Sequence, residues 1–265
     1  MPEHKFRFGT ALFVKPSIFE ADLFDEAAQR ELPELAELLL GEALAGPLAE
    51  RLPELRLAAG PGARSVKLQH NAGAGGCFPL HYDNAGPPSR RALTCVVYMN
   101  PGWRPGDGGE LELRPFLRPA VLVPPLMGRA ALFRSDRVLH RVRPSSAERL
   151  CFTVWVDGEA VNGSGDCGLT ARHLAAEPGA LEAFARSPVQ RAVSRAVYAE
   201  EYEASLRECM ERRPGELEEM LQEHRRHVAQ QRAHAQLGPF LGRLGALRAQ
   251  LEGAAGAEAE GQGPD

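Results

Sequence analysis

The stretch VLHRVRPSSAERLCFTVWV, residues 138–156, indicates the fold of this chain. Its second half is an alternating strand, since successive side chains of a strand point to opposite faces. One face is apolar and consists of Leu150, Phe152, Val154 and Val156. The other face is mixed and consists of Arg149, Cys151, Thr153 and Trp155. We expect the apolar face to pack on helices and the mixed face to point into a barrel. The turn at residues 144–148 predicts a hairpin, with strands 138–142 and 149–156 as neighbours.

Short strands of the same kind extend outward from this stretch over residues 63–158. The runs cover residues 65–69, 78–83, 92–100, 109–114, 120–123 and 130–135. Gly, Pro, Asn and Asp turns separate them, which is typical of a sandwich or barrel. We therefore predict an all-β core at about residues 63–158.

Both flanks of this core are predicted to be helical. Residues 22–57 are rich in Leu, Ala and Glu at helical spacing, and prolines divide them into short helices. The predicted parts are an N-terminal helical support region (1–62), a C-terminal helical region (159–252) and a disordered Gly/Ala/Glu tail (253–265). The predicted fold class is α+β.

The composition describes an ordinary globular chain of 265 residues. Its 31 basic and 35 acidic side chains give a net charge of −4, so no overall field attracts nucleic acid or an anionic membrane. No run of 18 apolar residues predicts a membrane span. Within the basic class, three residues are lysines and 28 are arginines; among the acidic residues only eight are Asp. Clusters of Arg therefore carry little information, while each scarce Asp carries more.

The five cysteines are widely spaced and odd in number, with no Cys-x-x-Cys pair. This pattern argues against a disulfide scaffold or a cysteine-rich zinc site. Cys77, Cys95 and Cys151 are predicted to be buried core thiols. Because the amino terminus also lacks a continuous apolar segment, we expect a reducing compartment, the cytoplasm or the nucleus.

His81 and Asp83 are predicted to reach one point, because residues i and i+2 of a strand share a face. A distant third ligand would complete a two-His, one-carboxylate triad, which leaves positions of Fe(II) open. His140, in the alternating run 138–142, is the natural candidate. A His-x-Asp pattern alone is weak, and its neighbours carry the interpretation.

Arg149 follows His140 by nine residues on an inward strand face, where a buried guanidinium needs an anionic partner. A dicarboxylate such as 2-oxoglutarate supplies one: its keto-acid end chelates the metal and its far carboxylate pairs with Arg149. Tyr98 lies on the same strand face as Thr94 and Val96, so its hydroxyl is predicted to donate to that carboxylate.

Residues 67–158 resemble the prolyl 4-hydroxylase group of Fe(II)/2-oxoglutarate dioxygenases, especially its hypoxia-sensing branch. Five collinear motifs carry the resemblance: HYDN at 81–84, LTCVVYMN at 93–100, GGEL at 108–111, FRSD at 133–136, and HRVRP at 140–144 with RLCFTVW at 149–155. The resemblance covers about a third of the chain.

The resemblance implies a double-stranded β-helix, a jelly-roll-like core. It implies Fe(II) ligation by His81, Asp83 and His140, with 2-oxoglutarate held by Arg149 and Tyr98. It also suggests that Val142, Thr153 and Trp155 line the co-substrate pocket. Dioxygen would be the second co-substrate and L-ascorbate the reductant. The implied reaction is hydroxylation of a C–H bond with release of succinate and CO2, most naturally on prolyl residues of a protein or peptide.

Several alternatives stay open at this point. His224, His227 and His234 share a helical face and could bind zinc, although the charged residues around them favour a solvated helix. The arginines 134, 137, 141 and 143 are expected on a solvated surface, and Asp136 at a turn. The whole chain could instead be a catalytically silent binding module, or a dioxygenase acting on a small molecule. A nucleic-acid substrate is the weakest option, since no basic stripe interleaved with aromatic residues is present.

Overall fold

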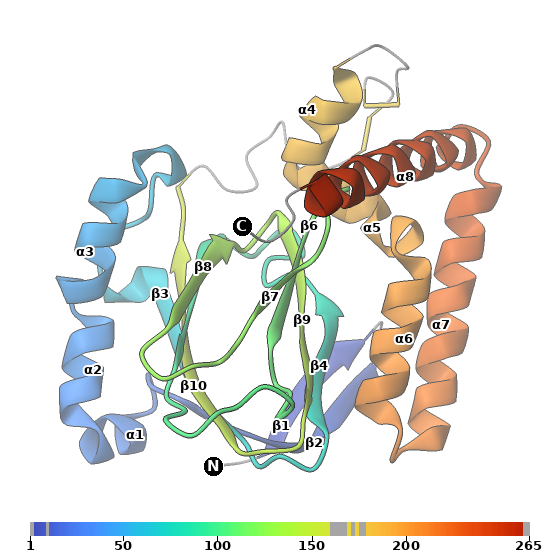
Figure 1. Ribbon diagram of the computed structural model, residues 1–265. Coiled ribbons are helices and arrows are strands. Elements are labelled where there is room, and N and C mark those ends of the chain that lie inside the picture. Colours follow the sequence, from blue (N-terminus) through green and yellow to red (C-terminus); the bar gives the residue numbers. More distant parts are fainter. Residues whose placement is uncertain (1–2, 9–10, 160–168, 171–172, 175–178, 262–265) are drawn as a thin grey trace.

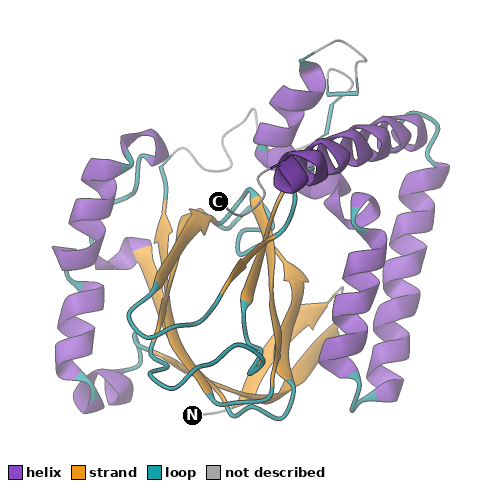
Figure 2. Ribbon diagram, in the orientation of Figure 1, coloured by secondary structure: helices purple, strands orange, loops and turns teal. Residues whose placement is uncertain are grey.

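The computed structural model describes residues 3–8, 11–159, 169–170, 173–174 and 179–261. Within them, two antiparallel sheets face each other across a barrel-like interior, and helices pack outside (Figures 1 and 2). One sheet has six strands and the other has four. The arrangement is the predicted double-stranded β-helix flanked by helices.

The six-stranded sheet has the order β1-β2-β3-β10-β5-β8. Its strands are β1 (Glu3–Phe8), β2 (Ala11–Asp22), β3 (Arg64–Asn71), β10 (Arg149–Asp157), β5 (Arg91–Tyr98) and β8 (Ala130–Arg134). The four-stranded sheet has the order β4-β9-β6-β7. Its strands are β4 (Gly76–His81), β9 (Val138–Ser145), β6 (Leu111–Pro115) and β7 (Val121–Val123). Every strand predicted inside residues 63–158 is present.

The predicted hairpin between residues 138–142 and 149–156 is wrong, because β9 and β10 belong to different sheets. β9 continues to Ser145, which pairs with Gly76 and forms a bridge to Gly108. The Ser145 hydroxyl then donates to the Ala147 carbonyl, 2.8 Å away. The turn is therefore a corner that carries the chain from one sheet to the other, as occurs where strands switch sheets.

The first 22 residues differ from the predicted helical support region, since β1 and β2 form a hairpin that extends the larger sheet. Residues Ile18–Asp22 of β2 pair with β3. At Ser17 the backbone has a φ of 63°, and before it Lys15 reaches the Cys77 carbonyl of β4. β2 thus spans the gap between the two sheets. Its apolar residues favour a strand as well as a helix, and pairing with β3 selects the strand.

Three short helices cover the outer face of the six-stranded sheet, at the left of Figure 1. They are α1 (Glu26–Glu31), α2 (Pro33–Leu40) and α3 (Glu42–Arg51). The Asp25 carboxylate caps α1 by accepting from the Ala27 amide at 2.8 Å. Leu39 packs in one cluster with Val154 and Val156 of β10, so the apolar face of that strand meets helices as predicted.

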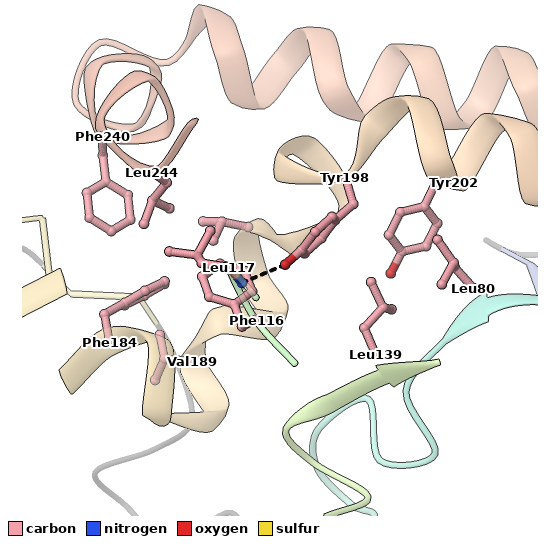
Figure 3. Packing of buried hydrophobic residues seen from close by; sticks show 11 residues of the cluster. Leu80, Phe116, Leu117, Leu139, Phe184, Val189, Tyr198, Tyr202, Phe240 and Leu244 are labelled. Atoms are coloured by element: carbon pink, nitrogen blue, oxygen red, sulfur yellow. Dashed lines mark hydrogen bonds between the residues drawn. The ribbon is translucent and has the colours of Figure 1, made fainter. Parts of the chain in front are cut away.

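The C-terminal helices cover the four-stranded sheet. They are α4 (Ala180–Arg186), α5 (Arg191–Val197), α6 (Ala199–Met210), α7 (Pro214–Ala233) and α8 (Leu237–Gly261). Figure 3 shows their shared core, in which Phe184 and Phe240 meet edge to face. The buried Tyr198 hydroxyl accepts from the Leu117 amide at 2.7 Å. This layer supports the sheet that carries His81 and His140.

The predicted disordered tail from Gly253 is also wrong as far as Gly261, since α8 continues to that residue. Ala and Glu dominate the segment, and both favour helix. Residues 262–265 lie outside the described part. Among the described helices, none combines the length and apolar character needed to cross a membrane.

Candidate active site

The three predicted metal ligands come together at one end of the four-stranded sheet. β4 and β9 are antiparallel with His81 opposite His140, and Asp83 follows β4 by two residues. One ligand atom from each residue can be chosen so that all lie within 4.8 Å of one another. The Asp83 carboxylate oxygens lie 3.7 Å from Nε2 of His81 and 3.5 Å from Nε2 of His140. The structure therefore brings together all three predicted ligands.

Backbone carbonyls orient both imidazoles. Nδ1 of His81 lies 2.8 Å from the Pro79 carbonyl, and Nδ1 of His140 lies 3.1 Å from the Val138 carbonyl. Each Nδ1 thus donates to a carbonyl, and each Nε2 faces the site. Burial and the neighbouring His140 lower the pKa of His81 to about 3, so this imidazole is neutral at physiological pH and suited to bind a metal.

Asp83 is held by a neighbouring hydroxyl. Thr94, on β5, donates to Oδ2 of Asp83 at 2.7 Å, and its own oxygen lies 2.7 Å from that of Ser135. Burial raises the pKa of Asp83, but His140, His81 and the Thr94 hydrogen bond outweigh burial and leave the pKa below its ordinary value. Asp83 is a carboxylate. Two imidazoles and one carboxylate on one face form a facial triad, the donor set of non-haem Fe(II) oxygenases.

Arg149 is fully inside the barrel, with 2% of its surface exposed. Its Nε donates to the Gly109 carbonyl at 2.9 Å, and a terminal nitrogen lies 3.3 Å from Sγ of Cys151. Within the described ranges, no carboxylate forms an ion pair with it. A buried guanidinium without an anion is costly, so this position calls for an anionic ligand.

Gly109 makes room for this arginine. Its φ is 75°, a conformation that L side chains rarely adopt, and a Cβ there would lie 2.9 Å from Cδ of Arg149. The Gly108-Gly109 pair of the sequence motif therefore has a steric role. Because these glycines have no side chain, the segment that leads into β6 can approach Arg149 closely.

Tyr98 provides a second buried donor beside Arg149. The Arg149 guanidinium carbon lies 5.1 Å from the centre of the Tyr98 ring. The Tyr98 hydroxyl is buried, and its polar neighbour is the Arg149 guanidinium. Burial raises the pKa of Tyr98 to about 12 although Arg149 opposes this, so the phenol is protonated and can donate to a carboxylate.

A cavity of about 330 Å³ connects the triad with Arg149. Val142, Thr153 and Trp155, which the resemblance suggests for the co-substrate pocket, are among the residues that line it. Tyr98 lies behind this wall and is absent from the lining. The sequence did not identify the remaining polar lining residues, which are Lys15, Glu20, Lys67, Gln69, Tyr82 and Arg91. The scarcity of lysine was the one usable signal, because two of the three lysines face this cavity.

The structure also places His224, Asp136 and Arg141, for which the sequence left alternatives open. His224 contacts the Ala199 carbonyl and Arg195, and among the described residues only the triad forms a cluster suited to a metal. Asp136 is buried and binds Arg134 through two hydrogen bonds of 2.8 and 2.9 Å. Arg141 is not on a solvated surface, because Glu112 and Glu208 pair with it.

The prediction that Cys77 is a free thiol is wrong. A disulfide joins Cys77 of β4 to Cys209 of α6, across 132 residues. Sequence spacing cannot show such a pair, because the fold alone brings the strand and the helix together. Cys95 and Cys151 are buried free thiols, as predicted.

The chain is similar to known proteins in sequence and in fold. The family model for the 2OG-Fe(II) oxygenase superfamily matches residues 66–157. The solved structure of a prolyl 4-hydroxylase from Phytophthora capsici is 47% identical over 88% of this chain and 78% of that chain, with a TM-score of 0.78. No curated protein matches the chain.

Two further solved structures share lower identity. A prolyl hydroxylase from Trichoplax adhaerens, in complex with a peptide fragment of the hypoxia inducible factor oxygen degradation domain, is 27% identical over 54% of this chain and 63% of that chain (TM-score 0.45). A Pseudomonas putida prolyl-4-hydroxylase is 28% identical over 54% and 70% (TM-score 0.41).

The chain therefore belongs to the 2OG-Fe(II) oxygenase superfamily. Within that superfamily it falls in the prolyl hydroxylase group, on the 47% identity and 88% coverage of the Phytophthora capsici structure, and it is an enzyme of this type. The family uses Fe(II), 2-oxoglutarate and O2, and the triad of this chain fits the metal.

Proposed function

We propose that this enzyme is a 2-oxoglutarate-dependent prolyl 4-hydroxylase that acts on proline-containing peptides or proteins. One observation carries the proposal: a cavity joins an intact facial triad to a buried arginine that no carboxylate of the described residues neutralises. Proline as the target is supported by the 47% identical prolyl 4-hydroxylase from Phytophthora capsici.

The residues of this chain have distinct roles in that reaction. His81, Asp83 and His140 would hold the iron, with Thr94 fixing the carboxylate. Arg149 would bind the far carboxylate of 2-oxoglutarate in a charge-assisted pair, and Tyr98 would add a hydroxyl donor. Iron bound there supplies the oxidation of a C–H bond, coupled to conversion of 2-oxoglutarate into succinate and CO2.

The apolar cavity walls serve the same chemistry. Val142, Phe78, Leu111 and Trp155 line the space between the triad and Arg149. Such walls exclude water, which strengthens the ion pair at Arg149 and protects the reacting centre. We also propose L-ascorbate as the reductant that keeps the iron ferrous during turnover.

Succinate formation tests the proposal. Purified protein with Fe(II), 2-oxoglutarate and ascorbate should form succinate slowly, and much faster when a proline-rich peptide is added. Mass spectrometry should locate one added oxygen on a proline. His140→Ala is the matched control, which should neither retain iron nor form succinate.

Two results would contradict the proposal. A folded, iron-loaded protein that never consumes 2-oxoglutarate would be a binding module. Stimulation by a small molecule, with no peptide in a proline library active, would keep the oxygenase and remove the peptide substrate.

A further inference from the structure

Lys15 is a buried lysine of the cavity, and the roles described above assign it no part. It lies on β2, before the bend at Ser17, and only 3% of its surface is exposed. Its Nζ lies 3.4 Å from the Cys77 carbonyl and 3.4 Å from the centre of the Phe78 ring. Burial lowers the pKa of Lys15 well below its usual range, although Glu20 opposes this. An interior lysine of this kind is costly to the fold.

The cationic side chains of the cavity have different partners. Lys67 pairs with Glu20 at 3.1 Å, and the Arg91 guanidinium lies 4.2 Å from the Trp155 ring centre. Arg149 and Lys15 are the two that are almost fully buried. A dicarboxylate entering the cavity brings two negative charges, one at each end. Arg149 accounts for one of them.

The strand register places Lys15 nearer to the metal end than Arg149. Along β4 and β9 the paired levels are Gly76 with Ser145, Phe78 with Val142, and His81 with His140. Arg149 lies at the first level, because Gly109 holds it beside Ser145. Lys15 lies over Phe78, at the middle level. The Phe78 ring centre is 6.3 Å from that of His81.

We propose that Lys15 binds the keto-acid carboxylate of 2-oxoglutarate, the end opposite to the one bound by Arg149. This inference rests on the proposed function. A keto-acid carboxylate that gives one oxygen to the metal keeps a second oxygen, which the ammonium group of Lys15 would meet in a charge-assisted hydrogen bond. β2 would then be part of the co-substrate site, although it lies outside the family match at residues 66–157.

Ligand binding to the Mn(II)-loaded, non-reacting protein provides the test, by isothermal titration calorimetry. Two ligands are compared: 2-oxoglutarate, and 2-oxopentanoate, which keeps the keto acid and lacks the far carboxylate. Lys15→Met should weaken the binding of both ligands by a similar factor, about tenfold or more. Lys67→Met is the matched control, since it also removes a cavity lysine, and should change the affinity by less than about threefold.

Thermal unfolding of the metal-free protein separates binding from a structural role. Lys15→Met should be at least as stable as the wild type, because it removes a buried charge and keeps the side-chain length. If it fails to fold, Lys15→Gln replaces it in the same titrations.

Four outcomes would overturn the inference. They are an unchanged affinity in Lys15→Met, an effect that disappears with 2-oxopentanoate, an equal effect in Lys67→Met, and a change confined to the KM for peptide. If wild-type protein binds neither ligand, the proposed function itself fails. If the wild type binds both ligands and Lys15→Met binds them with the same affinity, only the role of Lys15 is rejected.

Discussion

Arg149 shows how one residue can reveal a ligand. Its guanidinium is buried, and its contacts in the described part are a carbonyl, a sulfur and an aromatic ring. A hydrogen bond to a charged group contributes about 1.5–3 kcal/mol. Arg149→Met should therefore raise the KM for 2-oxoglutarate by about 10- to 100-fold, and leave iron binding nearly unchanged.

Steady-state kinetics and metal analysis check this prediction. Arg143→Met is the control, because Arg143 lies on β9, the strand that carries His140, and outside the cavity lining. Arg149→Lys should recover only part of the affinity, since lysine lacks the planar pair of donors. Equal KM values in wild type and Arg149→Met would remove Arg149 from the co-substrate site.

Thr94 is the residue that fixes the carboxylate ligand. It is fully buried and donates to Asp83 at 2.7 Å. Hydrogen bonds to metal ligands typically change metal affinity by 10- to 100-fold. Thr94→Val keeps the shape and loses the hydroxyl, so the affinity for Fe(II), or for Co(II) as a stable substitute, should fall by about tenfold or more. Thr153→Val serves as the control. Unchanged metal affinity in Thr94→Val would mean that Asp83 needs no such support.

The Cys77–Cys209 disulfide links helix α6 covalently to β4, the edge strand of the smaller sheet. A hydrogen bond from the Leu80 amide to the Ser205 hydroxyl, at 3.2 Å, joins the same two elements. A crosslink over so many residues restricts the unfolded chain strongly. Cys209→Ser should therefore lower the free energy of unfolding by about 2–5 kcal/mol.

Denaturant titration with and without reductant measures this effect. The wild type should lose stability on reduction, and Cys209→Ser should not respond. Peptide mapping that found Cys77 unlinked in protein prepared without reductant would contradict the disulfide. Disulfides persist in oxidising compartments and are rare in the cytoplasm and the nucleus. The reducing compartment expected from the sequence stays a prediction, and mapping of Cys77 and Cys209 in protein from its native cells would test it.

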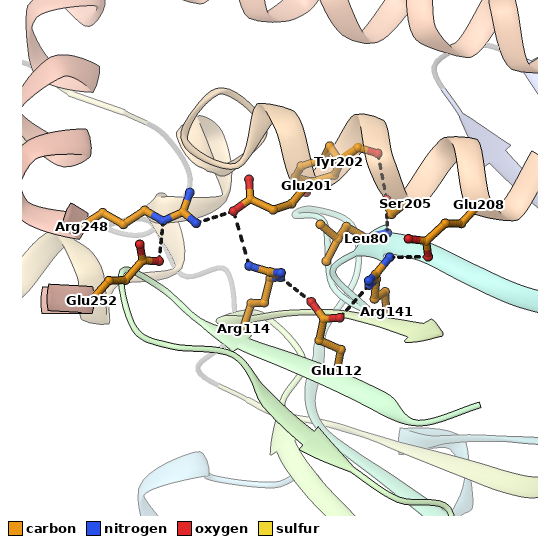
Figure 4. A network of polar contacts seen from close by, with 10 residues as sticks. All are labelled: Leu80, Glu112, Arg114, Arg141, Glu201, Tyr202, Ser205, Glu208, Arg248 and Glu252. Carbon is orange, nitrogen blue, oxygen red and sulfur yellow. Dashed lines mark hydrogen bonds and ion pairs between the residues drawn. The ribbon is translucent and has the colours of Figure 1, made fainter. Parts of the chain in front are cut away.

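Glu112 is the centre of an ion-pair network between the smaller sheet and the C-terminal helices (Figure 4). It accepts from Arg114 at 2.6 Å and from Arg141 at 2.8 Å. Arg114 continues to Glu201 and Arg141 to Glu208, both on α6. Removing the buried carboxylate leaves Arg114 and Arg141 with their α6 partners alone, so Glu112→Gln should lower the free energy of unfolding by about 3 kcal/mol.

The loss of stability in Glu112→Gln should depend on pH. Burial raises the pKa of Glu112, but the two arginines outweigh burial and hold it below its ordinary value of 4.5. The charged carboxylate therefore stabilises the fold fully above pH 4.5, and this contribution is lost as the pH falls through the lower pKa of the folded protein. Urea unfolding at pH 7 and at pH 3 should show a large difference between Glu112→Gln and wild type that shrinks in acid. Glu252→Gln, at the exposed end of the network, should show almost none.

For the molecule as a whole, the sequence predicts local order well and contacts between distant segments poorly. Alternation located every strand from β3 to β10, because the strand period is a property of neighbouring residues. His81 and His140 could be found because each lies on such a strand, and Asp83 because it follows His81 by two residues. The corner at residues 144–148 was mistaken for a hairpin, since a tight turn looks the same whether it joins strands of one sheet or of two.

The missed features all depend on contacts across long sequence distances. Lys15 meets Cys77 across 62 residues, and Cys77 meets Cys209 across 132. No periodicity encodes such contacts. The α8 extension was missed for a different reason: a Gly/Ala/Glu segment has too few apolar side chains to predict packing, yet its helix propensity is high.

The bend of β2 at Ser17 has a consequence for how this enzyme can be divided. Residues 66–157 match the superfamily model and contain all three proposed iron ligands, yet Lys15 and Glu20 of the cavity wall come from β2. A shortened chain that begins at residue 63 would have one side of its reaction chamber open to solvent. Grafting this catalytic unit onto another protein therefore requires the first 22 residues together with the barrel.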